Sequence, residues 1–342
     1  MYHKSIPCYA RFQWLNSPIV INTVAQFIQP PKRGRKGYDK VWMFRWLIYK
    51  QLMGCSYRDL ESMTKIDYST FIKFRKRLIK ENWFAGVFNF LSSAIAANLE
   101  SITALIDSSF VQTYSKRDEE GSEYFGYKEK NGFKLHQMID YETRLPLLQF
   151  ATAGARADIR WGANLIRAAP DYWNVREFAA DKAYDGANFV KDIILKFPGI
   201  KVAIPMRRHK KNDFWFNCFM KKWERTSDSA IYRKRSEIER YFSRKKRVFN
   251  LGEERTRGLE NFETNCYFTS IAEILEWSTK PEMWWALFTM LAYEVIKPIF
   301  IFDLCYHFIF TCAILASDVF GVRVGSAYDD VFSRQMASEL SF

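Results

Sequence analysis

The chain has 342 residues, which at about 150 residues per domain predicts two domains with room for an appendage. Its 51 Lys and Arg outnumber its 38 Asp and Glu, for a net charge of +13, and such an excess predicts a polyanionic partner, most often nucleic acid. The mean hydropathy of −0.26 excludes a polytopic membrane protein. Six cysteines without CxxC or zinc-ligand spacing predict reduced, buried thiols.

The positive charge is confined to the first 280 residues. After Lys280 the sequence has three basic and seven acidic residues, so residues 1–280 carry a net charge of +17. The first 280 residues are therefore the part that we expect to bind a polyanion. Residues 1–13 contain no long apolar run, which predicts no secretory signal and hence a cytoplasmic protein.

Residues 1–36 are predicted to be an irregular segment that ends in a basic arm. Prolines punctuate the segment, and glycines keep the arm at residues 32–37 extended. Arg33 and Arg35 on this arm are candidate contacts for a phosphate backbone or a narrow minor groove. A solvated basic linker is the open alternative.

Residues 37–100 are predicted to form an all-α helix-turn-helix domain. Apolar residues at helical spacing predict a helix over 41–53 that ends at Gly54, and Ser56 with Asp59 forms a capping box for a second helix. A third helix begins near Ser69, and its candidate DNA contacts are Lys73, Arg75, Lys76 and Arg77. A solvated charged face is the alternative, but the neighbouring basic arm favours DNA binding.

Residues 101–278 alternate strand and helix patterns, which predicts an α/β sandwich. The apolar run over residues 102–106 is predicted to be a buried strand that ends at Asp107, and a second strand over 177–180 is predicted to end at Asp181. Because open α/β sheets place their sites at the carboxyl ends of strands, these two aspartates are candidate site residues.

A strong helix is predicted from about Ile231, and one of its faces is polar. Four side chains fall within a sector roughly 60° wide at about 100° per residue: Tyr232, Arg235, Glu239 and Lys246. Glu237 lies nearly opposite and is the weaker metal candidate. A salt-bridged surface face, with Arg235 and Glu239 as an i,i+4 pair, is the alternative.

Three carboxylates that converge at a sheet edge can hold two divalent cations for in-line attack on a phosphodiester. We expect Asp107, Asp181 and Glu239 to converge in this way. Magnesium prefers oxygen ligands, and with only four histidines in the chain a histidine-rich zinc site is not expected.

These residues carry a family resemblance over roughly residues 37–278. Asp107 with two serines, the stretch around Asp181, and the spacing Tyr232-x2-Arg235-x3-Glu239-x6-Lys246 resemble the DDE transposases of bacterial and archaeal insertion sequences. This group has a Y-x2-R-x3-E-x6-K signature and an RNase H-like core. The chain departs from its pattern at Ala157, where the family often has histidine. Asp158 is interpreted as a helix N-cap, with a contact to the site as the open alternative.

The resemblance implies an insertion-sequence transposase, a polynucleotidyl transferase that cuts DNA and joins it to a target. Asp107, Asp181 and Glu239 would be the catalytic metal ligands, holding two Mg²⁺ ions for which Mn²⁺ can substitute. Tyr232, Arg235 and Lys246 would hold the transposon end. The implied partners are double-stranded element ends and target DNA, on which we expect a homodimer, in a prokaryotic cytoplasm at the nucleoid.

Two alternatives remain open for the function. One is a catalytically silent DNA-binding derivative that represses its own element, and the other is a structure-selective nuclease on an RNase H-like fold. The intact carboxylates argue against the first, and the helix-turn-helix argues against the second. The predicted fold class is thus α/β, an RNase H-like mixed sheet flanked by helices over residues 101–278, with the helix-turn-helix domain before it.

Residues 279–342 are predicted to be a hydrophobic helical tail outside the resemblance. Residues 298–316 are mostly apolar and near the length of a membrane span, but Asp303 and His307 would be expensive at mid-membrane. We therefore expect a core-packing or dimerising helix and no membrane partner. An altered reading frame at the end of a decayed element would also produce such a tail.

Overall fold

The computed structural model describes residues 5–7, 9–28, 37–113, 119–205, 229–252 and 257–280. All of them belong to a unit formed by Met1–Trp284, which is described here by itself; a second unit comprises Trp285–Phe342. Arg33, Arg35 and the apolar segment 298–316 lie outside the described residues. Among the described helices, none combines the length and apolar character needed to cross a membrane.

The N-terminal part of this unit is helical, and the prediction that residues 1–36 are irregular is wrong for residues 10–16 and 18–27, which form two helices. Its elements are η1 (Ala10–Asn16), α1 (Pro18–Phe27), α2 (Lys40–Met53), α3 (Tyr57–Thr64), α4 (Tyr68–Lys80) and α5 (Trp83–Ala97). The predicted capping box is confirmed, since Ser56 and Asp59 exchange side-chain and backbone hydrogen bonds at the start of α3. Gly54, in the left-handed region at φ 63°, ends α2 as predicted.

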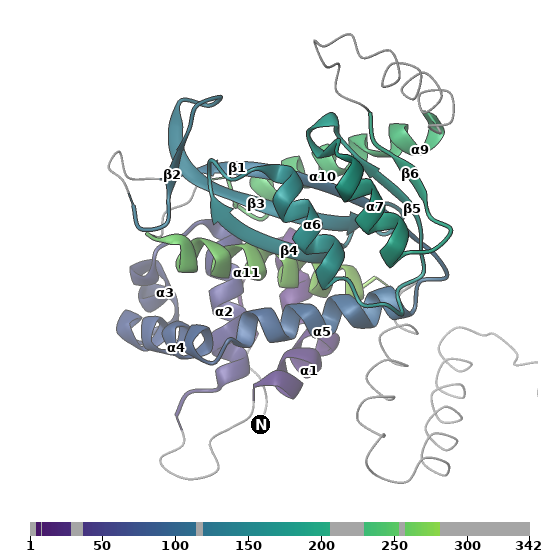
Figure 1. Cartoon of the computed structure of the whole chain (residues 1–342). Helices are drawn as coiled ribbons and strands as arrows, with labels where there is room; N and C mark the ends of the chain where they lie inside the picture. The colour runs from purple at the N-terminus through teal and green to yellow at the C-terminus, as the bar shows by residue number, and fades with distance from the viewer. Residues whose placement is uncertain are drawn as a thin grey trace, which may run out of the picture. The chain divides into compact units, whose positions relative to one another are not determined.

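A mixed sheet follows, with strand order β4-β3-β1-β5-β6 and a short β2 beside β3 (Figure 1). The strands are β1 (Ile102–Gln112), β2 (Glu123–Phe125), β3 (Lys130–Asp140), β4 (Pro146–Ala153), β5 (Val175–Ala180) and β6 (Lys201–Ala203). β3 is antiparallel to β1, β2 and β4, whereas β5 is parallel to β1 and to β6. The described part of the chain therefore has the predicted mixed α/β architecture.

Helices cover both faces of the sheet. On one face α6 (Asp158–Ala168) and α7 (Ala187–Lys196) pack on Ile102, Ala104 and Ile106 of β1. On the other face, Leu105 packs with residues of α9 (Ser229–Lys234), α10 (Ser236–Arg247) and α11 (Leu259–Ser278). Because side chains alternate along a strand, Asp107 faces the same side as Leu105, where α10 lies.

The prediction that the first strand ends at Asp107 is wrong, because β1 continues to Gln112. Parallel pairing with β5 stops at Ile106–Ala180, but antiparallel pairing with β3 continues as far as Gln112–Gly132. Polar residues can continue the strand here because β3 supplies their backbone partners. Residues 108–112 of β1, 130–136 of β3 and β2 thus form an extension of the sheet, here called the arm.

The single helix predicted from Ile231 is divided into α9 and α10 at Arg235. The amide of Arg235 bonds to the carbonyl of Tyr232 at 3.0 Å, and the amide of Ile238 bonds to the carbonyl of Arg235 at 3.1 Å. These are three-residue steps, so one tighter turn joins the two helices. The backbone of Arg235 stays helical, at φ −54° and ψ −30°, so the chain direction is preserved.

The 20-residue helix α11 connects the helical part to the sheet. It packs against α2 and α5 on one side and against β3 and β4 on the other (Figure 1). This double contact explains why α11 is buried on most of its surface rather than along one stripe.

Candidate active site

Asp107 and Asp181 are brought together by the parallel pairing of β1 with β5. Ile106 lies beside Ala180 in the register, and each aspartate is the next residue along its strand. Asp181 then caps the short helix η2 (Lys182–Tyr184), and its Oδ1 accepts a hydrogen bond of 2.6 Å from the amide of Ala183. The sequence prediction that these two carboxylates are neighbours thus agrees with the structure.

The environment of Asp107 disfavours its negative charge. Its pKa is raised to about 7, mainly by burial and in smaller part by the nearby carboxylates of Asp181 and Asp158, against a hydrogen bond from the Ser108 amide and the charge of Arg235. The side chain is 21% exposed. A partly buried carboxylate beside a second one is a favourable place for a cation.

Arg235 links Asp107 to Glu239. Its Nη1 lies 3.9 Å from Oδ2 of Asp107, and its Nη2 donates a hydrogen bond of 2.5 Å to Oε1 of Glu239. The guanidinium also lies 5.9 Å from the ring centre of Tyr232, whose side chain is 36% exposed. Three of the four residues on the predicted polar face are therefore in mutual reach.

The described residues contain no group of three His, Cys, Asp or Glu side chains placed to hold a metal ion. Asp107 and Asp181 fit a divalent cation, because both offer oxygen ligands and a bound cation would favour the charged form of Asp107 that burial disfavours. Glu239 is 58% exposed and bound to Arg235, so the predicted convergence of all three carboxylates is not present. Arg235 occupies the position between Glu239 and Asp107.

The prediction that Asp158 is the N-cap of a helix is wrong, because Ala157 holds that position and no side chain caps the helix; Asp158 instead belongs to this site. It is the first residue of α6 after the cap position Ala157. Its Oδ1 accepts hydrogen bonds from Ser108 Oγ at 2.7 Å and from Lys134 Nζ at 3.0 Å. No sequence pattern joins Ser108 to a residue 50 positions away, because only the pairing of β1 with β3 and the packing of α6 bring them together.

Two buried groups complete the surroundings. Tyr184 is fully buried, and burial together with the charges of Asp107, Asp158 and Asp181 raises the pKa of its hydroxyl well above the usual range. His136 is also fully buried, with Nε2 3.0 Å from Oγ1 of Thr152. His136 is therefore a hydrogen-bonded strand residue rather than a DNA contact.

Lys246, near the end of α10, reaches the arm. Its Nζ donates a hydrogen bond of 2.9 Å to the carbonyl of Phe110 in β1. Burial lowers its pKa, and so does the positive charge of Lys128 at the tip of the arm. The fourth residue of the polar face thus lies beside the arm, apart from the Arg235 cluster.

Glu237 points away from Asp107, as its position on the helix predicted. It is buried and forms ion pairs with Arg240 and with Arg144, whose Nε lies 3.0 Å from its Oε2. Its carboxylate is therefore occupied in fixing α10 to the loop between β3 and β4.

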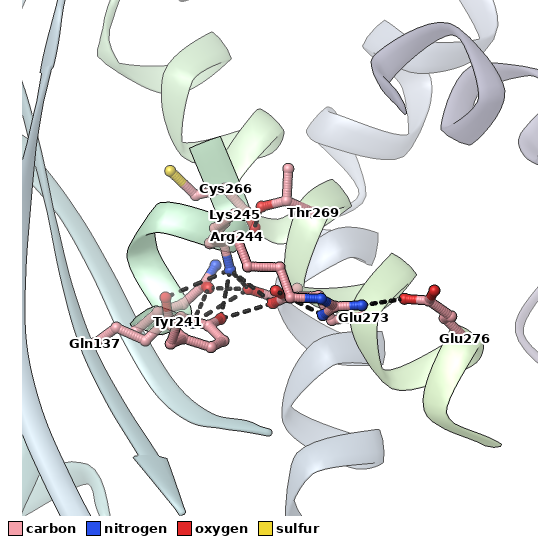
Figure 2. A network of polar contacts seen from close by, with 10 residues as sticks. Gln137, Tyr241, Arg244, Lys245, Cys266, Thr269, Glu273 and Glu276 are labelled. Atoms are coloured by element: carbon pink, nitrogen blue, oxygen red, sulfur yellow. Dashed lines mark hydrogen bonds and ion pairs between the residues drawn. The ribbon is translucent and has the colours of Figure 1, made fainter. Parts of the chain in front are cut away.

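A buried network holds α10 against α11 and the sheet (Figure 2). Lys245 Nζ lies 3.2 Å from Oε2 of Glu273, 2.6 Å from Oγ of Ser270 and 2.8 Å from the hydroxyl of Tyr241. Lys245 and Glu273 are 0% and 2% exposed, and burial lowers the pKa of Lys245 and raises that of Glu273.

Gln137, the β3 partner of Asp107, joins the network at 3.4 Å from Nζ of Lys245. The strand pair that carries Asp107 and the helix that carries Glu239 are thereby joined.

Among the predicted DNA contacts on α4, Arg75 must be reassigned. Lys73, Lys76 and Arg77 are exposed, but Arg75 is 8% exposed. Its guanidinium donates to Oδ1 of Asn261 at 2.8 Å and to Oδ1 of Asn265 at 3.2 Å. The prediction that Arg75 faces DNA is therefore wrong, because α11 covers that side of α4 and supplies the acceptors.

Paired carboxylates on neighbouring strands, here at the point where the parallel pairing of β1 with β5 stops, with an arginine beside them, are typical of enzymes that act on phosphodiesters with divalent metal ions. Residues 99–275 match the family of transposase DDE domains. This match covers more than half of the chain, so the chain belongs to the DDE transposases, which generally use divalent metal ions.

A search of the curated proteins found no match for the chain. A structure of piggyBac transposase, in a synaptic complex with hairpin DNA, is similar with a TM-score of 0.34 and 14% sequence identity, covering 59% of this chain and 51% of that one. The chain thus spans about half the length of that protein.

Proposed function

We propose that the chain is an insertion-sequence transposase that binds the ends of its element as a homodimer, cuts them and joins them to target DNA. The observation that carries this proposal is the pairing of Asp107 with Asp181 at adjacent strand positions, with Arg235 linking Asp107 to Glu239. These carboxylates lie within the matched transposase domain. The mixed sheet, with an antiparallel half and a parallel half, supports an RNase H-like core.

Asp107 and Asp181 would hold divalent cations, with Mg²⁺ as the natural ion and Mn²⁺ as a substitute. Bound divalent ions activate an attacking hydroxyl and stabilise the charge that develops on the phosphate. Glu239 completes the carboxylate set, and Arg235 balances the charge of Asp107 and Glu239 while the metal is absent. The signature Y-x2-R-x3-E-x6-K assigns Glu239 this role.

The other residues of the polar face would hold the DNA end. The half-exposed ring of Tyr232 presents a π-face on which a displaced base can stack. Arg235 offers a planar donor group for a phosphate, and Lys246 adds a cation beside the arm. Lys73, Lys76 and Arg77 on α4 would contact the backbone of the end sequence in a helix-turn-helix arrangement.

The test is a transposition reaction with the purified full-length chain. The substrate is a plasmid that carries the element with its own flanking inverted repeats, incubated with Mg²⁺, with Mn²⁺ or with a chelator. We expect metal-dependent cuts at the element ends and products in which the 3′ ends are joined to target DNA. End binding without cuts under any of these conditions would instead assign the chain to the DNA-binding repressors, and cuts at branched DNA alone would assign it to the structure-selective nucleases.

A further inference from the structure

Two tyrosines at the tip of the arm are exposed to solvent. β2 pairs with residues 130–132 of β3, and residues 126–129 form the turn between the two strands. Tyr124 is 58% exposed and Tyr127 is 84% exposed. The ring of Tyr127 lies 6.2 Å from that of Phe125, but both tyrosine rings remain mostly exposed, and two exposed aromatic rings at one hairpin tip indicate an interaction surface.

The base of the arm is firmly packed. The ring of Phe110 lies 5.3 Å from that of Phe125, and it is seated so closely over Gly132 and Gly154 that a Cβ at either position would come within 3 Å of it. The tip is therefore presented by a rigid base, and the side chain of Tyr124, which alternates with Phe125 along β2, is directed away from this packing.

The arm is connected to the carboxylate site at its base. Ser108 and Lys134 of the arm bind Asp158, which lies near Asp107. Lys246 of α10 bonds to the arm at Phe110, and the ring of Phe110 packs on that of Phe125 in β2, next to the tip. The charge of Lys128 at the tip also lowers the pKa of Lys246. The tip is thus continuous with the Lys246 surface that the proposed function assigns to DNA.

The charge of the tip fits a polyanion. Lys128 and Lys130 are exposed, and Nζ of Lys128 lies 5.3 Å from the ring centre of Tyr127. Glu123 is neutralised by Arg156 at 2.7 Å, which leaves Glu129 as the acidic residue between the two lysines. Aromatic rings interleaved with lysines are the combination that proteins use to hold nucleic acid strands, the rings against bases or sugars and the lysines at phosphates.

We infer that the arm tip, formed by Tyr124, Tyr127, Lys128 and Lys130, is a second DNA-binding element that holds the DNA beyond Lys246. This inference rests on the proposed function, because it assumes that Lys246 lies on the DNA path. It assigns DNA contacts to residues that lie outside the Y-x2-R-x3-E-x6-K signature and outside α4.

Binding of the full-length chain to two fluorescent duplexes tests the inference. One duplex carries the inverted repeat of the element, and the other has an unrelated sequence. The double variant Tyr124→Ala, Tyr127→Ala should bind about tenfold more weakly or worse, because stacking on both rings is removed. The matched variant Tyr124→Phe, Tyr127→Phe should bind nearly as the wild type does, because the π-faces are kept. Tyr172→Ala is the control, since that tyrosine is 64% exposed but precedes β5 at the opposite end of the sheet.

The lysines are tested by the salt dependence of the same binding. Lys128→Gln with Lys130→Gln should lower the slope of log affinity against log salt by about one for each phosphate that the protein no longer neutralises. Weaker binding to both duplexes places the tip on flanking or target DNA, and weaker binding to the inverted repeat alone places it on the element end; either result supports the inference.

Wild-type affinity and salt slope in the alanine and glutamine variants would overturn the inference. So would conversion of a dimer to a monomer in the alanine variant with unchanged affinity per monomer, because the tip would then contact a second copy of the chain.

The proposed function is tested separately by cleavage. If the wild type cuts DNA in a metal-dependent and Asp107-dependent way while the tip variants bind normally, only the inference fails. If the wild type binds DNA but never cuts, the proposed function fails.

Discussion

The helix α10 takes part in two clusters of charged residues that differ in burial and in the partners that surround them. At its C-terminal half, Lys245 and Glu273 are buried and surrounded by hydrogen-bonding partners. At its N-terminal end, Arg235 and Glu239 lie at the surface, and Arg235 stands 3.9 Å from a carboxylate whose charge is disfavoured. The first cluster is enclosed by the protein, whereas the second is open to a bound ion or to DNA, as the proposed function requires. A buried charged pair thus fixes the position of a helix, while a pair of charges at the surface leaves groups accessible to a ligand.

The largest expected effect is on the surface cluster. Asp107→Asn or Asp181→Asn keeps the shape of the site and removes one carboxylate charge. Cleavage and strand transfer should both fall about a thousandfold, the scale seen when one preorganised charge-stabilising group is removed. Gel analysis of cut and joined products measures both steps. End binding should stay near the wild-type value, since α4 is untouched; an active Asp107→Asn enzyme would contradict the proposed site.

The next effect concerns the buried cluster. Lys245→Met leaves the buried Glu273 with only the half-exposed Arg244, 3.7 Å away, as its cation, which should lower the free energy of unfolding by up to about 3–5 kcal/mol. Urea denaturation measures this change. The double variant Lys245→Met, Glu273→Leu should recover much of the stability, because no unpaired charge remains in the core. If the double variant is as unstable as Lys245→Met, the cost arises from packing rather than from charge.

On α4, two neighbouring cations should respond in opposite ways. Arg75→Ala removes hydrogen bonds to Asn261 and Asn265. It should therefore lower the free energy of unfolding by about 1–3 kcal/mol, and the melting temperature with it. Lys76 is exposed, so Lys76→Ala should leave the free energy of unfolding unchanged while it reduces the salt dependence of DNA binding. Thermal denaturation and binding titrations on both variants separate the two roles. The reverse pattern would restore Arg75 as a DNA contact.

His136 predicts a pH dependence of stability. Burial lowers its pKa from 6.5 to about 4, with the nearby charge of Lys134 also lowering it and that of Asp158 opposing the shift. As the pH falls below about 6.5, this residue takes up a proton in the unfolded chain, whereas in the folded chain it takes one up only near pH 4. The free energy of unfolding therefore decreases as the pH falls through this window.

His136→Gln carries no titrating group at this position, so its melting temperature should fall less than that of the wild type between pH 7 and pH 4. Parallel thermal scans across this range measure the difference. Equal pH slopes for the two proteins would show that folding does not lower the pKa of His136.

The smallest effect distinguishes stacking from hydrogen bonding at the surface cluster. Tyr232→Phe should bind the element end almost as well as the wild type, whereas Tyr232→Ala should lose about 1–3 kcal/mol of stacking. Equilibrium binding to a duplex with an unpaired base near its end measures both. Equal damage from the two substitutions would make the hydroxyl the group that acts.

The pairing of Asp107 with Asp181 could be predicted because each follows an apolar run, and parallel neighbouring strands align their ends. The extension of β1 to Gln112 could not be predicted in this way, since the residues after Asp107 gain strand structure only from pairing with β3. The burial of Arg75 escaped prediction for a related reason. Helical spacing shows which side chains share a face, but it does not show that α11, almost 190 residues later, covers that face.

The position of Glu239 shows a further limit. Spacing placed it correctly on the same side as Arg235, and the i,i+4 ion pair between them was considered as an alternative. That pair is the arrangement present, because a nearby guanidinium satisfies a solitary carboxylate. Arg33 and Arg35 lie outside the described residues, and their expected contacts stay predictions.

The helix α11 has a mechanical consequence for the whole protein. Asn265 on this helix holds α4 through Arg75, and Glu273 on the same helix holds α10 through Lys245. Eight residues of helix separate the two attachment points, a rise of about 12 Å. A helix that is buried along most of its length and bonded at both points holds α4 and α10 at a fixed spacing. In the proposed function, the distance between the DNA backbone that α4 would contact and the bond that would be cut near α10 is therefore set by the protein and not by the DNA.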